Sequence, residues 1–464
     1  MAIWLPDLAG RRGPKYLQIV QAMAEDIASG DLPAETRLPP HRELAWQLGL
    51  SPNTTSRAYA EGTRRALLRG EVGRGTFVRP AGSRGEDGHA GDLRRSSSGP
   101  IDLSRNLPLP GLAEPHIRRV LTGIGQGGGL PALLDYQTDM DLSRHTGAGT
   151  RWLAQCGIEA PLDEVTVTNG AQHGLLCTLM ALLRPGDLLL VEALSYVPVR
   201  AMAATLGLNL RAVEMDAEGI CPESLDSICK EAAPKALYFM PTLQTPTTTT
   251  LSAERRQAIA GIARRHGLTL IEDDVFGLLK PDRPAPVATL APERTVYVTS
   301  VSKCIAPGLR VGYLRAPRDI GPALRHAVNL STWMTPPVTS EIAARLILDG
   351  TASRLADEQR AAAAQRQRLA RRILKDHGYA SDPHGLHIWL PLPGGWHADH
   401  FCSAAGQRGV LVTPGSSFAM RSGDDPAAIR ICLSHEPGEE RLREGLAVIG
   451  ALLAQPPIAG KMIV

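Results

Sequence analysis

The stretch Thr299-Ser300-Val301-Ser302-Lys303, followed by Ala306-Pro307-Gly308-Leu309-Arg310-Val311-Gly312-Tyr313, is the most informative part of the chain. It places one lysine among small hydroxyl side chains, a few residues before an arginine. A lysine amine forms a Schiff base with the aldehyde of pyridoxal phosphate, and hydroxyl and guanidinium groups bind its phosphate. The stretch therefore predicts a pyridoxal-phosphate site at Lys303, with Ser300, Ser302 and Arg310 on the phosphate.

The sequence around this stretch has an α/β pattern. Apolar runs typical of buried strands occur at residues 164–168, 188–192, 236–240, 269–272 and 295–299, with helical stretches between them. This alternation favours a layered α/β domain with a mainly parallel sheet. From about residue 340 the chain is helical, and runs at 386–390 and 428–433 predict strands of a smaller α+β subdomain.

Two other segments are predicted to contact the cofactor. Asn169-Gly170-Ala171-Gln172-His173 follows a strand and opens an apolar helix. Its glycine lets the backbone approach a phosphate, and the helix start offers N–H donors from Gly170, Ala171 and Gln172. Asp273, with Glu272 and Asp274 beside it, follows an apolar strand, where a carboxylate pairs with the pyridinium nitrogen.

The first 80 residues have a different organisation. Apolar residues recur at a helical period over residues 16–29, and Gly30 ends that helix. A short helix over 41–48 stops at Gly49, and Ser51-Pro52 starts a third helix, from about 53 to 68. Residues 70–78 predict two short strands about a glycine turn. Helix, turn and helix followed by a small hairpin is a winged helix-turn-helix pattern.

This segment resembles the winged helix-turn-helix domain of the GntR family. The resemblance rests on Pro14-x-Tyr16-x-Gln18-Ile19, Arg37-Leu38-Pro39, Arg42-Glu43-Leu44-Ala45, Leu48-Gly49, Ser51-x-Asn53-Thr54 and Gly73-x-Gly75-Thr76-Phe77-Val78. Ser51, Asn53 and Thr54 start the helix that enters the major groove. Arg42 and Arg57 are placed for phosphates or base edges, and Arg74 at the wing tip for the minor groove. One such helix reads only a few base pairs, so useful affinity implies a dimer on an operator with paired half-sites.

Residues 101–464 resemble the fold-type-I aminotransferases, and the whole chain is similar to the MocR subfamily of GntR regulators. The resemblance implies that Tyr196 stacks on the cofactor, that Arg430 grips a ligand carboxylate or other acid group, and that Tyr136 reaches the partner subunit's phosphate. It also implies a homodimer, head to tail, with DNA-binding domains crossing to the partner.

The chain departs from the relatives at two cofactor positions. Thr245 stands where they have an asparagine and Phe276 where they have a tyrosine, both bonding the ring's phenolic oxygen. Thr245 keeps one possible donor, and Phe276 has none. The departures leave cofactor binding intact and weaken its electronic tuning.

Length and composition agree with this division. The 464 residues exceed one ordinary core, and we expect a DNA-binding domain over 13–80, a flexible linker over 81–100 rich in Gly, Ser, Arg and Asp, and a cofactor domain over 101–464. The net charge of +3 does not by itself indicate a nucleic-acid binder, and the seven scattered cysteines have no zinc spacing. We see no signal peptide and no membrane-spanning apolar stretch, so a cytoplasmic protein is expected.

A DNA reader and a cofactor site on one chain favour a transcriptional regulator. We expect it to sense an amino acid, an amine or the vitamin itself through an aldimine at Lys303. The alternative is an active aminotransferase that carries a DNA-binding appendage. Lys303, Asp273 and Arg310 suit either function, whereas Thr245 and Phe276 favour the regulator.

Overall fold

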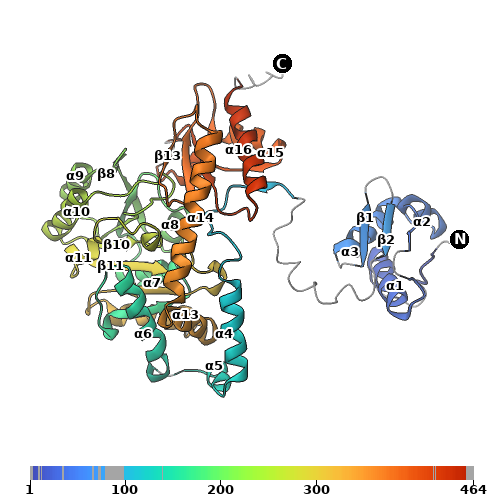
Figure 1. Ribbon diagram of the computed structural model, residues 1–464, viewed down its shortest axis with the longest axis horizontal. Helices are drawn as coiled ribbons and strands as arrows, with labels where there is room; N and C mark the ends of the chain where they lie inside the picture. The colour runs from blue at the N-terminus through green and yellow to red at the C-terminus, as the bar shows by residue number, and fades with distance from the viewer. Residues whose placement is uncertain are drawn as a thin grey trace. The chain divides into compact units, whose positions relative to one another are not determined.

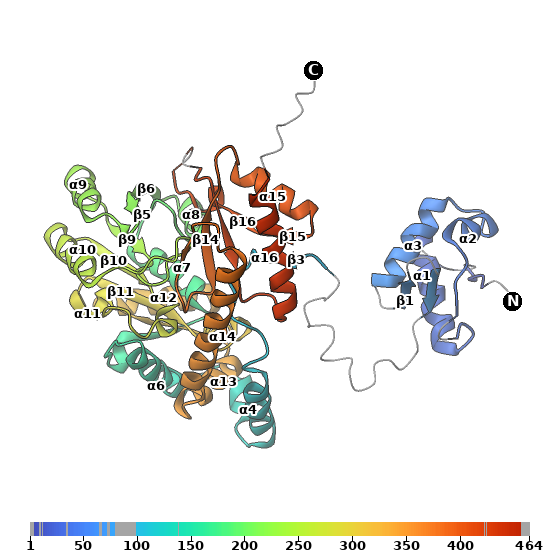
Figure 2. The ribbon, with the colours of Figure 1, turned by 45° about the horizontal axis from the view of Figure 1, so that its top comes forward.

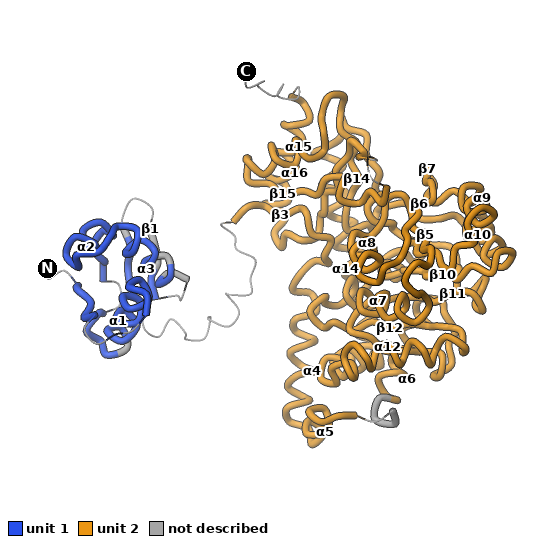
Figure 3. Tube along the Cα trace, turned by 180° about the vertical axis from the view of Figure 1, so that it is seen from behind, with its two compact units in different colours: residues 1–97 blue, residues 98–464 orange. Residues whose placement is uncertain are grey.

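A computed structural model describes residues 4–8, 11, 13–33, 36–64, 67–71, 75–78, 99–137, 139–421, 423 and 425–455. The chain divides into two compact units, residues 1–97 and 98–464 (Figure 3). Most of the predicted linker lies outside the described residues. Among the described residues, we find no helix that is both long and apolar enough to cross a bilayer. All seven cysteines are described, and none forms a disulfide.

The first unit is a winged helix-turn-helix. Helices α1 (Lys15–Ser29), α2 (His41–Gln47) and α3 (Pro52–Arg64) precede the antiparallel strands β1 (Leu68–Glu71) and β2 (Gly75–Val78), all blue in Figure 1. Apolar side chains of every element form its core, including Ile19, Met23, Leu44, Ala58 and Val78. The third helix was predicted to run to about residue 68, but it ends at Arg64 because Leu68 is the first residue of β1, paired with Val78.

The second unit is built on a seven-stranded sheet of order β4-β12-β11-β10-β9-β5-β6. Its strands are β4 (Val165–Thr168), β5 (Leu188–Glu192), β6 (Asn209–Val213), β9 (Ala236–Phe239), β10 (Thr269–Asp273), β11 (Thr295–Ser300) and β12 (Gly312–Arg315). Only β12 is antiparallel to its neighbours. The mainly parallel sheet is therefore confirmed, although β6 and β12 were not predicted.

Helices cover both faces of this sheet, as parallel strands require. Alternate residues along the central strands enter different clusters: Val191, Tyr238 and Ile271 belong to one, and Leu190, Leu237 and Leu270 to the other. The covering helices are α6 (Asp139–Gln155), α7 (Ala171–Leu182), α8 (Val197–Thr205), α9 (Pro222–Ala232), α10 (Ala253–His266), α11 (Val287–Leu290), α12 (Gly321–Thr332) and α13 (Pro337–Leu348). A small hairpin, β7 (Met215–Asp216) with β8 (Gly219–Ile220), precedes α9.

A smaller α+β subdomain completes the unit. Its sheet has the order β13-β14-β17-β16, formed by Ala380–Ser381, His387–Pro391, Ala428–Cys432 and Thr413–Pro414, with α15 (Ala398–Gln407) and α16 (Glu439–Leu453) packed beside it (Figure 2). The long helix α14 (Thr351–Ile373) runs from α13 to α16. Strand β3 (Ile101–Asp102) pairs with β15 (Val410–Leu411), and α4 (Glu114–Gln126) and α5 (Leu130–Leu134) follow it. The chain thus enters this unit through the subdomain before it builds the large sheet.

Candidate functional site

A cavity of about 220 Å³ lies at the carboxyl ends of the sheet strands, where α/β folds bind ligands. Most of the residues predicted to hold the cofactor line it together, with Arg430, the residue predicted for a ligand's acid group: Lys303, Asp273, Tyr196, Ala171, Gln172, Thr245, Ser300, Ser302, Arg310 and Arg430. Gly170, the N-cap of α7, adjoins it. Ten positions spread over 260 residues of sequence therefore meet around one small space.

Lys303 follows β11 and is half-buried in this cavity. Its Nζ donates to the backbone oxygen of Asn106 at 2.5 Å and lies 5.2 Å from the centre of the Phe276 ring. Burial, together with the positive charges of Arg430 and Arg310, lowers the pKa of Lys303 to about 8. A substantial fraction of this amine is therefore uncharged near neutral pH, as a nucleophile for an aldehyde must be.

Asp273, the last residue of β10, presents an unsatisfied oxygen. Its Oδ2 accepts from the Tyr238 hydroxyl at 2.8 Å, whereas its buried Oδ1 has no hydrogen-bond partner among the described residues. Burial raises the pKa of Asp273 to about 6. A buried acceptor without a donor is costly, so a donor such as a protonated ring nitrogen fits this position.

The opposite end of the cavity is a crowded turn between β4 and α7. Gly170 has a φ of 81°, and a Cβ on it would lie 2.8 Å from Arg310 Nη2. A Cβ on Gly312 would lie 2.6 Å from the backbone carbon of Gly170. Arg310 Nη2 donates to the Asn169 backbone oxygen at 3.1 Å. These two glycines let a guanidinium and the first amides of α7 share one small space, which suits a phosphate.

Hydroxyl and aromatic groups line the rest of the cavity. Ser300 and Ser302 are both buried, and the Ser300 hydroxyl oxygen accepts from the Ser302 amide at 3.4 Å. The Tyr196 hydroxyl donates to Gln172 Oε1 at 3.3 Å, and burial raises the pKa of Tyr196 to about 12. Thr245 and Phe276, the two residues that differ from those of the relatives, are both buried and both line the cavity.

Arg430 reaches the cavity from strand β17 of the subdomain. Its Nη2 donates to the Ser104 backbone oxygen at 2.6 Å, and its buried Nε has no partner among the described residues. The guanidinium lies 4.8 Å from the centre of the Phe418 ring. The site thus retains a buried donor for an acidic ligand group.

Three residues of the site were missed by the sequence predictions. Asn106 accepts from Lys303 through its backbone, and its side chain lies 3.1 Å from Nδ1 of His387. Burial and the charge of Arg430 lower the pKa of His387 to about 3, so its imidazole is neutral. Tyr238, which holds Asp273, was predicted only as part of a buried strand. A tyrosine in an otherwise apolar run was the one available signal.

Tyr136 lies away from the cavity of its own chain. Its side chain is 76% exposed and meets the ring of Trp333, itself 70% exposed, edge to face at 6.0 Å between centroids. Tyr136 therefore has no role at Lys303 of the same chain.

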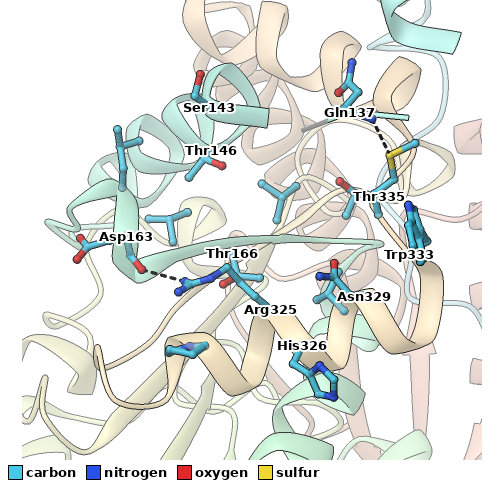
Figure 4. Close-up of a pocket in the computed structure, with 16 residues that line it drawn as sticks. Gln137, Ser143, Thr146, Asp163, Thr166, Arg325, His326, Asn329, Trp333 and Thr335 are labelled. Atoms are coloured by element: carbon cyan, nitrogen blue, oxygen red, sulfur yellow. Dashed lines mark hydrogen bonds between the residues drawn. The ribbon is translucent and has the colours of Figure 1, made fainter. Parts of the chain in front are cut away.

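A larger hollow of about 940 Å³ lies beside edge strand β4, between α6 and α12 (Figure 4). Thr166 on β4, Asn329 on α12 and Trp333 line it, and Arg325 donates to the Asp163 backbone oxygen at 3.2 Å. None of the predicted cofactor residues lines this hollow.

The predicted DNA-contacting residues lie at the start of α3 and on α2. Ser51 Oγ accepts from the Thr54 amide at 3.3 Å and lies 2.9 Å from the Thr54 hydroxyl, so Ser51 caps the helix. Asn53 and Arg57 are exposed one turn apart on α3, and the Arg57 guanidinium lies 4.5 Å from the centre of the Tyr16 ring. Arg42 is exposed on α2, and Arg74 lies outside the described residues.

Two family models match the chain in these two units. The model described as "Bacterial regulatory proteins, gntR family" matches residues 15–78, and "Aminotransferase class I and II" matches residues 146–449. Together with the fold and the cavity, they define a DNA-binding transcriptional regulator with an aminotransferase-like domain. The aminotransferase fold and the residues of the cavity fit pyridoxal phosphate as the cofactor. The chain belongs to the MocR subfamily of the GntR regulators.

Curated relatives match the chain over nearly its whole length. The chain is 30% identical to the vitamin B6 salvage pathway transcriptional repressor PtsJ of Salmonella typhimurium, over 90% of this chain and 94% of that protein. It is 27% identical to the HTH-type transcriptional regulator TauR of Rhodobacter capsulatus (96% and 97% covered) and 27% to the HTH-type transcriptional regulator YdeF of Bacillus subtilis (97% and 96%).

Solved structures show the same fold for the second unit. The kynurenine aminotransferase of Pyrococcus horikoshii superposes with a TM-score of 0.71 at 23% identity, over 80% of this chain and 97% of that one. The α-aminoadipate aminotransferase LysN of Thermus thermophilus gives a TM-score of 0.70 at 23% identity, over 78% and 96%. At this identity the likeness establishes the fold alone.

Proposed function

We propose that this regulator senses an amino acid, an amine or the vitamin itself through pyridoxal phosphate held at Lys303. The observation that carries the proposal is the meeting of Lys303, the unpaired Oδ1 of Asp273 and Arg310 around one cavity. When bound, the cofactor supplies an aldehyde that condenses with amines and a ring that withdraws electrons.

The protein's own groups have separate tasks in this proposal. Lys303 holds the cofactor covalently, and Asp273 accepts a hydrogen bond from its ring nitrogen. The phosphate is bound by Arg310, by the first amides of α7 and by hydroxyl groups. The groups proposed at that end are the amides of Ala171 and Gln172 and the hydroxyls of Ser300 and Ser302. Gly170, whose N–H donates to the Thr168 backbone oxygen, gives Arg310 the room to approach. Tyr196 covers the ring, and its hydroxyl is anchored on Gln172.

Sensing requires that a ligand favour one arrangement of the protein over another. Lys303 belongs to the large domain, whereas Arg430 and His387 belong to the subdomain. An amino acid whose amino group lay beside Lys303 and whose carboxylate paired with Arg430 would connect these two parts. Such a ligand stabilises the arrangement in which both contacts form, and this is the change transmitted to the DNA-binding unit.

We also propose that the regulator acts as a homodimer. Tyr136 and Trp333 are exposed together, and Leu134 and Leu330 are 72% and 69% exposed. Exposed large apolar groups of this kind mark interaction surfaces. A second copy covering them would bring Tyr136 toward the partner's phosphate site and would pair two helix-turn-helix units for two half-sites.

A second candidate function is an aminotransferase with a DNA-binding appendage. It is favoured by the same grouping of Lys303, Asp273 and Arg430, because transamination uses all three. It is disfavoured by Thr245 and Phe276, which replace two donors of the relatives. The regulator is the better supported of the two.

The absorption spectrum of the full-length protein distinguishes these functions when amines and amino acids are titrated in and products are analysed. A lasting spectral change with one compound, without an oxo acid, supports the sensor, and DNA footprinting with that compound then tests regulation. Accumulation of an oxo acid with conversion of the cofactor to its amine form would establish the enzyme instead.

A further inference from the structure

We propose that His173, as the neutral tautomer with its hydrogen on Nε2, is a positioning residue that fixes the phosphate-binding turn and ties it to helix α12. The carrying observation is a chain of hydrogen bonds from Asn169 through the imidazole to Ser331. The inference rests on the proposed role of residues 169–172 in holding the cofactor's phosphate.

The tautomer follows from the partners of the ring. The Asn169 backbone N–H can only donate, and it lies 3.0 Å from His173 Nδ1, so Nδ1 accepts. The hydrogen of a neutral ring is then on Nε2, which donates to Ser331 Oγ at 2.8 Å. The Ser331 hydroxyl in turn donates to the Ala327 backbone oxygen at 2.8 Å. The donor and the acceptor of each of these three hydrogen bonds are therefore assigned.

Asn169 is held at both of its backbone polar atoms. Its N–H is bound by His173, and its oxygen accepts from Arg310 Nη2 at 3.1 Å. The next residue, Gly170, is the N-cap of α7, and its N–H donates to the Thr168 backbone oxygen at 2.8 Å, so the turn is bonded on both sides of Asn169. Loss of the imidazole acceptor leaves a half-buried N–H without its partner and frees one side of this turn.

The same ring connects the cofactor site with another part of the surface. Ser331 lies in the last turn of α12, two residues before Trp333. Trp333 borders the larger hollow (Figure 4), and its ring contacts that of Tyr136. His173 therefore links the phosphate-binding turn to the end of α12, where the exposed aromatic pair lies.

Protonation would break the arrangement, because an N–H on Nδ1 would face the N–H of Asn169. Burial and the positive charge of Arg310 lower the pKa of His173. The other titratable group in contact is Cys177, whose Sγ lies 3.2 Å from Nε2; burial raises its pKa, so it stays neutral. Ser331 on α12 carries no charge. The bond to Asn169 is therefore present at neutral pH and is lost as the pH falls through the lowered pKa of His173.

The test measures the dissociation constant of pyridoxal phosphate for the full-length protein, by visible absorbance, between pH 8 and 5.5. His173→Leu removes the acceptor and should weaken binding about fivefold to tenfold at pH 8, the worth of one hydrogen bond. His173→Asn places an amide oxygen near the position of Nδ1 and should recover most of that loss. Because asparagine does not titrate, this variant should also lose affinity less steeply in acid than the wild type. The two proteins share the titrations of Lys303, Asp273 and the phosphate, so the difference between their pH profiles reports His173. His400→Leu, on α15, is the matched imidazole control.

Equal affinities of His173→Leu and His400→Leu at pH 8 would overturn the inference, as would an affinity of His173→Asn no better than that of His173→Leu. Thermal unfolding of the cofactor-free variants separates loss of the fold from loss of the turn. Failure of the wild type to bind the cofactor at Lys303 is a different result, since it overturns the proposed cofactor site and this inference with it.

Discussion

Gly312→Ala tests whether the phosphate end of the cavity depends on close backbone approach. The added Cβ would lie 2.6 Å from Gly170 C and 2.9 Å from Ala171 N, against ordinary contacts of 3.4–4 Å. The overlap is with backbone at the start of α7, which cannot rotate aside, so the turn itself must move. Overpacking of this kind costs about 1–3 kcal/mol. If the cost falls on the phosphate-binding turn, the dissociation constant of pyridoxal phosphate rises about 5- to 150-fold.

The matched control is Gly308→Ala. Gly308 lies in the same loop, and a Cβ there would meet no atom within 4 Å. The assay is cofactor titration by visible absorbance, with thermal unfolding of both cofactor-free variants. If Gly312→Ala binds pyridoxal phosphate within about twofold of Gly308→Ala, which is well under the 1 kcal/mol at issue, the steric account of this turn is wrong.

Four other variants have defined outcomes. Lys303→Ala should abolish the absorbance of the lysine-bound cofactor while leaving the fold and operator-independent DNA binding intact; a protein-linked band that persists in the spectrum contradicts the assignment. Asp273→Asn should weaken cofactor binding yet stabilise the cofactor-free protein. The pKa of Asp273 is raised from 3.8 to about 6, so its buried carboxylate lowers the free energy of unfolding by roughly 3 kcal/mol above pH 6 and by about half of that at pH 5. The stability gained by the variant, measured by denaturant unfolding at pH 8 and pH 5, should therefore be smaller at pH 5. Arg430→Gln should weaken an acidic effector about 10- to 100-fold, the worth of a charge-assisted hydrogen bond, and should spare a simple amine in the same spectral titration. The double variant Thr245→Asn with Phe276→Tyr should increase oxo-acid formation from amino acids, and an unchanged product yield would show that these positions do not limit turnover.

The parts of the fold that could be predicted are those with strong local patterns. Residues 236–239 are apolar apart from the Tyr238 hydroxyl, and they form a central strand buried on both faces. Asp273 ends one such strand and Lys303 lies three residues beyond another, so placing the strands also placed these two residues at one edge of the sheet. The short strand Gly312–Arg315 was missed because its glycine and arginine obscure the pattern, and its antiparallel direction depends on the turn at Arg310.

The missed site residues come from distant segments without local signals. Asn106 follows the two-residue strand β3, whose partner β15 lies some 300 residues later in the chain. His387 begins β14 in the subdomain and reaches the site only because that sheet packs beside the large one. The role of His173 depends on Ser331 of another helix. Such contacts are fixed by tertiary packing, which the spacing of residues along the sequence does not contain.

The lowered pKa of Lys303 has a consequence for the chemistry of the whole chain. Its other lysines are Lys15, Lys230, Lys235, Lys280, Lys375 and Lys461, so arginine supplies most of the positive charge. An amine with a pKa of about 8 is roughly one-tenth uncharged at pH 7, whereas an ordinary lysine is uncharged to less than about one part in a thousand. Arginine does not compete, because its guanidinium stays protonated. Dilute aldehydes should therefore label Lys303 ahead of the other lysines, and this selectivity comes from the scarcity of lysine in the chain as well as from the shape of the cavity.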